Sequence, residues 1–342
     1  MKILVTGGCG FVGSNIAIYL KNNLKNTQIS SLDNLIRKGA SLNLKRLKKH
    51  KINNYKINIE DFKKIKKLPK FQLIIDCCAE PAIEASRKDK NRVFNTNLLG
   101  TFNILQKCIN DKSNIIFLSS SRVYSIEKLK ELVKNPNLRK PIKIKKKICE
   151  NFETSSASSL YGFTKLASEK LIKEFFYKTK LKYLVNRFGV IAGPWQFGKQ
   201  DQGFVTLWMA SHILKKKLSY IGFGGKGHQV RDIIHIDDVC SIVLLQIKKI
   251  KKIYNSTFNI GGGLKNAISL KKLTNKCEKL TQNKITISKN SRTSIFDIPY
   301  YVTDNSKIIK SYRWKPKKNL NHILIDIFNW INKNKMVVEH FK

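Results

Sequence analysis

Short apolar runs alternate with helical patterns through the first half of the chain. The run FQLIIDCCA at 71–79 is nearly continuous, as expected for a strand buried on both faces of a parallel sheet. The same patterning predicts strands at 2–6, 28–33, 113–119 and 183–187, and helices at 12–22, 94–108 and 161–177. Strands that alternate with helices imply right-handed crossovers, so the expected fold class is α/β with a Rossmann-type doubly wound parallel sheet.

The pattern becomes more irregular after about residue 190. We expect one domain over 1–190 and a smaller, mainly C-terminal α/β region over 191–342, from which the chain re-enters the sheet near 232–260. Helices are predicted in this second part near 207–217, 237–247, 270–280 and 320–334. The lysine-rich stretch at about 125–153 is interpreted as an insertion in the first domain, a loop with some helix. A basic interaction arm is the alternative.

Composition narrows the class of protein only slightly. The net charge of +43 comes from 66 basic and 23 acidic residues, but only ten of the basic residues are arginine. Arginine is the residue that binds phosphates and bases in bidentate fashion, so a lysine excess favours a compositional habit over a nucleic-acid surface. The seven cysteines form no C-x-x-C pair, and no apolar stretch is long enough to span a bilayer. We therefore expect a cytoplasmic protein without a metal, a membrane or a nucleic-acid partner.

A glycine-rich turn follows the first predicted strand and opens the first predicted helix. The sequence TGGCGFVG at 6–13 places glycines at 7, 10 and 13, where they permit a tight turn and close approach of the backbone to a pyrophosphate. Asp33 follows at the end of the next strand, placed for a ribose diol, and an acid there repels the 2′-phosphate of NADP. The predicted cofactor is NAD, although Arg37 and Lys38 follow closely and could accommodate a phosphate.

A second group of residues has the character of proton-transfer chemistry. Tyr161 and Lys165 are spaced i, i+4 on one face of a predicted helix, so the ammonium can favour the phenolate form of the tyrosine and reach a nicotinamide ribose. Ser120 ends the strand before the insertion, where its hydroxyl can hydrogen-bond the reacting substrate oxygen. Each feature alone is weak, but their order along the chain after the glycine turn and Asp33 favours a catalytic set.

The quoted motifs carry a family resemblance over essentially the full chain. TGGCGFVGSN at 6–15, YGFTKLASEK at 161–170, GKGHQVRDIIHIDDV at 225–239 and FNIGGG at 258–263 resemble an extended short-chain dehydrogenase/reductase of the nucleotide-sugar epimerase and dehydratase family. Within that family, DNLIRKGA at 33–40 and DQG at 201–203 are most similar to the CDP-tyvelose (CDP-paratose) 2-epimerases.

The resemblance implies an isomerase that acts on a nucleotide sugar. Tyr161 would remove a hydroxyl proton while a sugar carbon gives hydride to NAD, with Lys165 and Ser120 assisting, and the keto-sugar would take the hydride back on its other face. The dehydratases of the family carry an Asp-Glu pair where this chain has Ser121 and Arg122, so dehydration is not expected. A CDP-sugar 2-epimerase is the preferred function. A UDP-sugar 4-epimerase, a nucleotide-sugar oxidoreductase and, remotely, an RNA- or polyanion-binding protein are the alternatives.

The resemblance also assigns residues to the two ligands and implies a homodimer or homotetramer. On this basis residues 1–190 would bind NAD and 191–342 mainly the substrate. The expected cofactor contacts are Gly7, Gly10, Phe11, Val12, Gly13, Asp33, Asn34, Asn58, Ile59, Ala79, Asn97, Tyr161 and Lys165. The expected substrate contacts are Ser120, Ser121, Gln202, Arg231 and Arg292, with Asp201 and Trp195 nearby. The chain departs from the usual family residues at Val190, Ile57-Asn58 and Glu80-Pro81. These departures affect the assignment of the substrate more than that of the cofactor.

Overall fold

The structure is a computed structural model that describes residues 1–81, 89–133, 138, 140–143, 146–156, 159–199 and 202–341. The chain forms two compact units. The first comprises Met1–Val123, Ser159–Arg187 and Val239–Phe258, and the second comprises Tyr124–Ser158, Phe188–Asp238 and Asn259–Lys342. Each unit is thus assembled from segments far apart in the sequence, and each is described by itself.

The first unit is built on a seven-stranded sheet in the order β10-β6-β5-β4-β1-β2-β3. Its strands are β1 (Lys2–Thr6), β2 (Gln28–Leu32), β3 (Asn53–Tyr55), β4 (Leu73–Asp76), β5 (Asn114–Ser120), β6 (Tyr183–Phe188) and β10 (Ser256–Ile260). β1 pairs in parallel with both β2 and β4, so Ile3 faces Ile29 on one side and Leu73 on the other. The strand order reverses beside β1, and open parallel sheets bind ligands at such a switch point. The predicted α/β class is confirmed.

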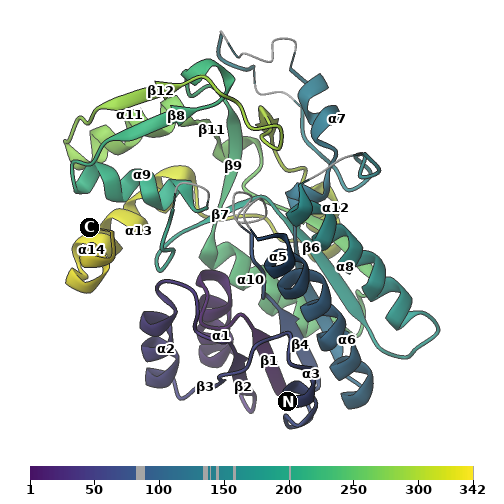
Figure 1. The fold of residues 1–342 in the computed structure, drawn as a ribbon. Helices are drawn as coiled ribbons and strands as arrows, with labels where there is room; N and C mark the ends of the chain where they lie inside the picture. Colours follow the sequence, from purple (N-terminus) through teal and green to yellow (C-terminus); the bar gives the residue numbers. More distant parts are fainter. Residues whose placement is uncertain are drawn as a thin grey trace. The chain divides into compact units, whose positions relative to one another are not determined.

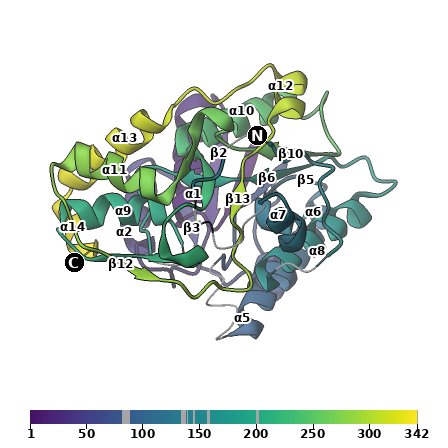
Figure 2. The same cartoon turned by 90° about the horizontal axis from the view of Figure 1, so that it is seen from above.

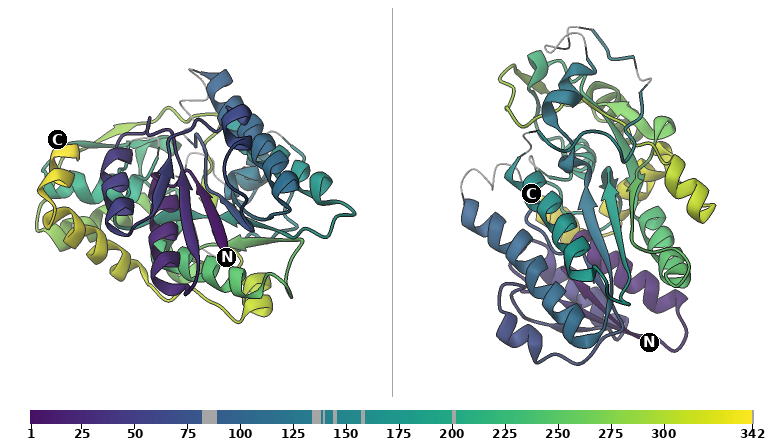
Figure 3. Two further views of the ribbon diagram at one scale, coloured as in Figure 1. Left: turned by 90° about the horizontal axis from the view of Figure 1, so that it is seen from below. Right: turned by 90° about the vertical axis from the view of Figure 1, so that its right-hand side faces the viewer.

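Helices cover both faces of this sheet (Figures 1 and 3). The helices α1 (Phe11–Asn23) and α2 (Ala40–Lys49) lie on one face, and α3 (Phe62–Lys66), α6 (Gly100–Asp111) and α8 (Leu160–Phe176) lie on the other. Leu4 belongs to a buried cluster with Ile104 of α6 and Ile172 of α8, whereas its neighbours Ile3 and Val5 are equally buried. Side chains of a strand alternate between faces, so the nearly continuous apolar runs in the sequence reflect a sheet buried on both sides.

Two predicted elements of the first unit differ clearly from the structure in their extent. The strand expected at 71–79 spans only Leu73–Asp76, and the N–H groups of Cys77 and Cys78 then donate to the side-chain hydroxyl of Thr6 in β1 instead of a backbone carbonyl. The helix expected at 94–108 begins earlier, as α5 (Lys90–Phe94), and passes through the π-helical turn η1 (Asn95–Leu99) into α6. Both departures lie beside the glycine turn or the candidate catalytic helix.

The second unit contains a small sheet of β11 (Ala267–Ser269), β9 (Val230–His235) and β13 (Tyr300–Tyr301), with β7 (Val190–Ala192) also paired to β9. A parallel pair joins β8 (Leu218–Ile221) to β12 (Ile287–Asn290). Helices α9 (Phe204–Ile213), α11 (Leu270–Thr281) and α13 (Leu320–Asn332) pack on these strands, and α14 (Lys335–Phe341) packs on α9 and α13 (Figure 2). Further elements are α7 (Ile126–Glu131), α12 (Ser306–Tyr312) and α10 (Ile236–Lys249), which runs from this unit into the first.

The lysine-rich stretch that follows β5 is attached to the second unit. Tyr124 is fully buried, and its hydroxyl donates to Asn259 Oδ1 at 2.6 Å. The backbone N–H of Asn259 in turn donates to Glu150 Oε1 at 2.8 Å, and Ile148 N–H donates to the Val302 carbonyl at 2.8 Å. These bonds fix both ends of the stretch.

Among the described residues, no helix is both long and apolar enough to cross a bilayer.

Candidate active site

The glycine turn connects β1 to α1 with a geometry that only glycine permits. Gly7 has φ +59°, and Gly10 N–H donates to the Gly7 carbonyl at 2.9 Å. A Cβ on Gly13 would lie 2.3 Å from the same carbonyl oxygen, so the first turn of α1 packs directly on the loop. Gly10 occupies the N-cap without a side-chain cap. The N–H groups of the first helical turn, Phe11 and Val12 included, are therefore suited to an anion such as a pyrophosphate.

Asp33 lies directly after β2, where its carboxylate ties that strand to the glycine turn. Oδ2 accepts the Cys9 N–H at 3.0 Å and Oδ1 accepts the Leu35 N–H at 2.8 Å. Burial raises the pKa of Asp33, while these backbone bonds and the charge of Arg37 oppose that shift. The Asp33 carboxylate therefore lies beside the glycine turn, where an acid can accept the hydroxyl groups of a ribose.

The other expected cofactor residues of the first unit lie on neighbouring loops. Asn34 accepts the Ile36 N–H, and Asn58 is exposed and accepts the Glu60 N–H. Ile59 is buried in the cluster that lies between the sheet and α6, and Gly100 packs so closely on it that a Cβ there would lie 2.7 Å from the isoleucine. Ile59 therefore has a structural role in the core.

The three candidate catalytic side chains lie in the first unit, on β5 and α8, which pack against each other. Ser159 caps α8 by accepting the Gly162 N–H at 3.2 Å, which sets the start of the helix just before Tyr161. Tyr161 is 9% exposed and Lys165 only 1%. The Lys165 ammonium lies 4.4 Å from the centre of the Phe117 ring of β5, and Ser120 ends that strand. The face of an aromatic ring attracts a cation, so this contact helps to hold the Lys165 side chain in place.

A hydrogen-bond network that the sequence did not reveal holds α8 in place. Asn97, in the π-helical turn, donates to Thr164 Oγ1 at 3.1 Å, and its carbonyl accepts from the Ser168 hydroxyl at 3.3 Å. Thr164 directly precedes Lys165. Asn97 was expected to touch the cofactor, and the structure shows it fully buried and bonded to the candidate catalytic helix.

A buried ion pair fixes the same helix to the sheet. Glu169 of α8 accepts from Arg187 of β6 at both oxygens, with Arg187 Nε 3.0 Å from Oε1 and Nη2 2.7 Å from Oε2. The hydroxyl of Ser119, next to Ser120, donates to the same carboxylate. Sequence reasoning missed this pair. The four-residue spacing of Tyr161, Lys165 and Glu169 on one helix face was the available signal.

The chain offers no carboxylate directly after Ser120. Ser121 opens the short 3-10 turn η2 (Ser121–Val123), and the backbone N–H of Arg122 donates to Ser120 Oγ at 3.2 Å. The Ser120 hydroxyl is thereby oriented by the turn that follows it. Neither Ser121 nor Arg122 carries an acid that could protonate a leaving hydroxyl group.

The expected substrate residues of the second unit differ in how they are held. Arg231, on β9, donates to the carbonyls of Val230 at 2.8 Å and Ile298 at 2.5 Å, and to Asp297 Oδ1 at 3.2 Å. Gln202 and Arg292 are exposed. Asp201 lies outside the described residues.

Trp195 belongs to the second unit and packs on aromatic side chains. It has φ +70°, and its ring centre lies 5.7 Å from that of Trp330. The structure therefore places Trp195 against the core helix α13.

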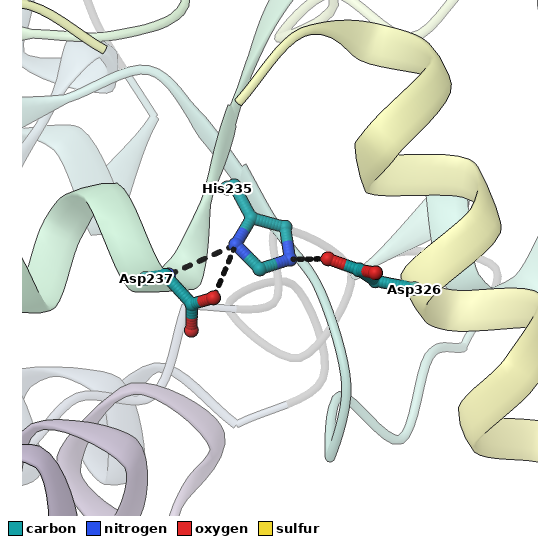
Figure 4. Close-up of side chains that lie close together, drawn as sticks. All are labelled: His235, Asp237 and Asp326. Carbon is teal, nitrogen blue, oxygen red and sulfur yellow. Dashed lines mark hydrogen bonds and ion pairs between the residues drawn. The ribbon is translucent and has the colours of Figure 1, made fainter. Parts of the chain in front are cut away.

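Close by in the second unit, His235, Asp237 and Asp326 form the one compact group of possible metal ligands found among the described residues, with ligand atoms within 4.8 Å of one another (Figure 4). His235 Nδ1 accepts the Asp237 N–H at 3.0 Å, so the neutral ring carries its proton on Nε2, which faces Asp326 at 3.4 Å. Burial lowers the pKa of His235, and the Lys318 ammonium already pairs with Asp326 at 2.9 Å. The Nδ1 lone pair is occupied by the Asp237 N–H and the Asp326 carboxylate by Lys318, so these polar contacts link β9 to α10 and α13.

Comparison with known proteins gives the family. Residues 3–261 match the NAD dependent epimerase/dehydratase family, and the chain belongs to it. The CDP-paratose 2-epimerase of Salmonella typhi is 28% identical over 96% of this chain and 99% of its own length. A putative UDP-glucose 4-epimerase of Methanocaldococcus jannaschii is 26% identical over 97% of this chain and 99% of its own.

A solved structure agrees with this assignment. The UDP-glucose 4-epimerase of Thermotoga maritima, crystallised with UDP-glucose, superimposes with a TM-score of 0.81 at 26% identity and covers 97% of this chain and 99% of its own. The expected family, the Rossmann-type sheet, the enzyme class and NAD as cofactor are confirmed.

Proposed function

We propose that this enzyme inverts one carbon of a nucleotide sugar by transient oxidation, with a CDP-sugar and carbon 2 as the preferred substrate and position. The observation that carries the proposal is the set Ser120, Tyr161 and Lys165 on packed elements, with no acid at positions 121 and 122. Epimerisation needs no additional acid, whereas loss of water does. The full-length similarity to a CDP-paratose 2-epimerase supports the choice of sugar, and the similar UDP-glucose 4-epimerases support a UDP-sugar 4-epimerase as the alternative.

The proposed mechanism divides the proton chemistry among the three side chains. The phenolate oxygen of Tyr161 accepts the proton of the sugar hydroxyl as the carbon beneath it loses hydride. Ser120 hydrogen-bonds the same sugar oxygen, and the Lys165 ammonium stabilises the negative charge on the tyrosine. NAD supplies the hydride acceptor and, once reduced, the donor. After the keto-sugar has turned, Tyr161 returns the proton and the carbon regains hydride on the opposite face, so no net oxidation results.

The glycine turn and Asp33 fit the cofactor that the family requires. The uncapped first turn of α1 can bind the pyrophosphate, and the Asp33 carboxylate can accept the ribose hydroxyls. In the second unit we propose Arg231 as the contact to the nucleotide diphosphate, because a guanidinium matches two phosphate oxygens at once.

The substrate proposal is tested with a panel of CDP-, UDP-, GDP- and dTDP-sugars in deuterated water, followed by proton NMR. We expect inversion at a single carbon of a CDP-sugar, retention of protium there, and no accumulation of NADH. Net NADH formation would instead favour the nucleotide-sugar oxidoreductase. Turnover of UDP-sugars alone, with inversion at carbon 4, would favour the alternative epimerase.

We propose that the protein is a homodimer formed through the helices that cover one face of the first unit. Phe94, Leu99, Phe102 and Phe163 are 45%, 37%, 37% and 53% exposed on α5, η1, α6 and α8, which pack together. Exposed large apolar side chains on helices that pack together favour association. Sedimentation of the purified protein should give twice the chain mass, and Phe163→Glu with Phe102→Glu should halve it. A monomeric wild type, or a dimer unaffected by both charges, would contradict this arrangement.

A further inference from the structure

Glu80 is a buried acid that the proposed chemistry does not use. It follows β4, is 4% exposed, and binds two arginines through its two carboxylate oxygens. Arg37 Nη2 lies 2.8 Å from Oε1, and Arg92 Nη2 lies 2.8 Å from Oε2. Arg37 also donates to the Ala79 carbonyl at 3.5 Å. One carboxylate therefore joins the loop after β2 and the helix α5 to the loop after β4.

The backbone of Glu80 is fixed as well as its side chain. Asn97 Oδ1 accepts the Glu80 N–H at 2.7 Å, and Asn97 Nδ2 donates both to the Glu80 carbonyl at 3.2 Å and to Thr164 Oγ1 at 3.1 Å. Thr164 precedes Lys165 on α8. The carboxylate that holds Arg37 is thus part of the same hydrogen-bonded framework as the candidate catalytic helix, and its position is well defined.

Arg37 lies on the loop where an adenosine ribose would be recognised. It follows Asp33 by four residues, and its charge is one of the influences that oppose the rise in the Asp33 pKa. In dinucleotide-binding folds an acid at this place binds the ribose hydroxyls, and an arginine nearby accommodates the 2′-phosphate of NADP. This chain therefore carries a residue suited to each cofactor, and the partner of Arg37 decides whether the second one can act.

We propose that Glu80 makes the site selective for NAD over NADP by holding Arg37 in an ion pair, away from the ribose 2′ position. The inference rests on the proposed placement of the cofactor at Asp33. A 2′-phosphate could bind Arg37 only if the ion pair with Glu80 were broken, and it would also be repelled by the Asp33 carboxylate. Both effects disfavour NADP. A 2′-hydroxyl brings no charge and leaves the ion pair intact.

The selectivity is measured as the ratio of nucleotides bound at equilibrium. Purified protein is incubated with equal concentrations of NAD and NADP, freed of unbound nucleotide, and the bound nucleotides are released by heat and separated by chromatography. The wild type should carry NAD almost alone. In Glu80→Gln, which keeps the side-chain size but removes the charge, the NADP share relative to NAD should rise about tenfold, the effect of one charge-assisted hydrogen bond.

Two further variants show whether the effect passes through Arg37. Arg92→Gln removes the other arginine at the same 2.8 Å distance from Glu80, and it should leave the nucleotide ratio unchanged. The double variant Glu80→Gln with Arg37→Gln should lose the gain of the single variant. An unchanged ratio in Glu80→Gln, or a gain that persists without Arg37, would overturn the proposal.

A third variant covers the case in which Glu80→Gln does not fold. Because Glu80 already occupies Arg37 in the wild type, Arg37→Gln alone should barely alter the weak binding of NADP. A clear loss of NADP binding in Arg37→Gln would show that Arg37 serves the phosphate despite Glu80, and the proposal would be wrong. If the wild type bound neither nucleotide, the proposed function itself would fail, which distinguishes the two outcomes.

Discussion

Replacing Tyr161 with phenylalanine should slow epimerisation by about 10³-fold, within the usual contribution of a positioned acid–base group. The ring remains, so the packing of the 9%-exposed side chain at the start of α8 is kept while the proton acceptor is lost. Most of the bound NAD should be retained, because the glycine turn, Asp33 and Lys165 are unchanged and only the hydroxyl of Tyr161 is lost. The measurement is kcat with the substrate that the nucleotide-sugar panel identifies, together with the NAD content of the purified variant.

Tyr177 provides the matched control for this substitution. It follows the same helix, is 66% exposed, and belongs to the same unit. Tyr177→Phe should retain the wild-type rate. If Tyr161→Phe epimerised at more than about a tenth of the wild-type rate, another group would have to accept the proton. The proposed role of Tyr161 would then be wrong.

Replacing Arg187 with leucine should lower the free energy of unfolding by about 3–5 kcal/mol, because it leaves the Glu169 carboxylate buried without its cation. The side chains of the pair are 9% and 2% exposed, and Arg187 bonds both carboxylate oxygens. Denaturant unfolding followed by circular dichroism measures the loss. We also expect lower activity, because the pair fixes the helix that carries Tyr161 and Lys165.

A double substitution distinguishes the effect of the unpaired Glu169 carboxylate from the effect of the packing lost with the Arg187 side chain. The double variant Arg187→Leu with Glu169→Leu removes both charges and should recover a large part of the stability. Lys128→Leu, which breaks an exposed pair with Glu131, should leave the unfolding midpoint essentially unchanged. If Arg187→Leu were no more destabilising than Lys128→Leu, the pair would not fix α8 in the way described.

The features that can be predicted from the sequence depend on residues that lie close together in the chain. The glycine turn needs residues within seven positions, and the candidate catalytic helix shows its chemistry at Tyr161 and Lys165 through a four-residue interval. The doubly wound sheet follows from apolar runs of strand length. In each case the physical cause lies within a few residues, so pattern alone suffices.

The features that the sequence does not reveal depend on partners far apart in the chain. Glu80 finds Arg37 on one loop and Arg92 on another, and no spacing rule connects these three residues. In the sequence, Glu80 and Pro81 stand out only as a departure from the usual family residues. The π-helical turn that points Asn97 at Thr164 is likewise invisible, because a helical pattern does not distinguish i+4 from i+5 bonding.

The return of segment 239–258 to the first unit lies between these two cases. The sequence indicates a re-entry near 232–260, but β9 pairs within the second unit and only β10 joins the large sheet. The division falls inside α10, in its first turn, although α10 is one continuous helix with apolar residues at helical spacing. Periodicity predicts the helix, and long-range packing decides to which unit each part of it belongs.

In the proposed mechanism, hydride leaves one carbon of the sugar and returns to the same molecule. A crossover experiment examines this step, with substrate deuterated at the inverted carbon mixed with substrate labelled by carbon-13 elsewhere, in ordinary water. After many turnovers, mass spectrometry of the epimer should find the deuterium retained and none transferred to the carbon-13 molecules. Loss of deuterium to water would mean proton abstraction at carbon, and the proposed roles of Tyr161, Lys165 and NAD would be wrong.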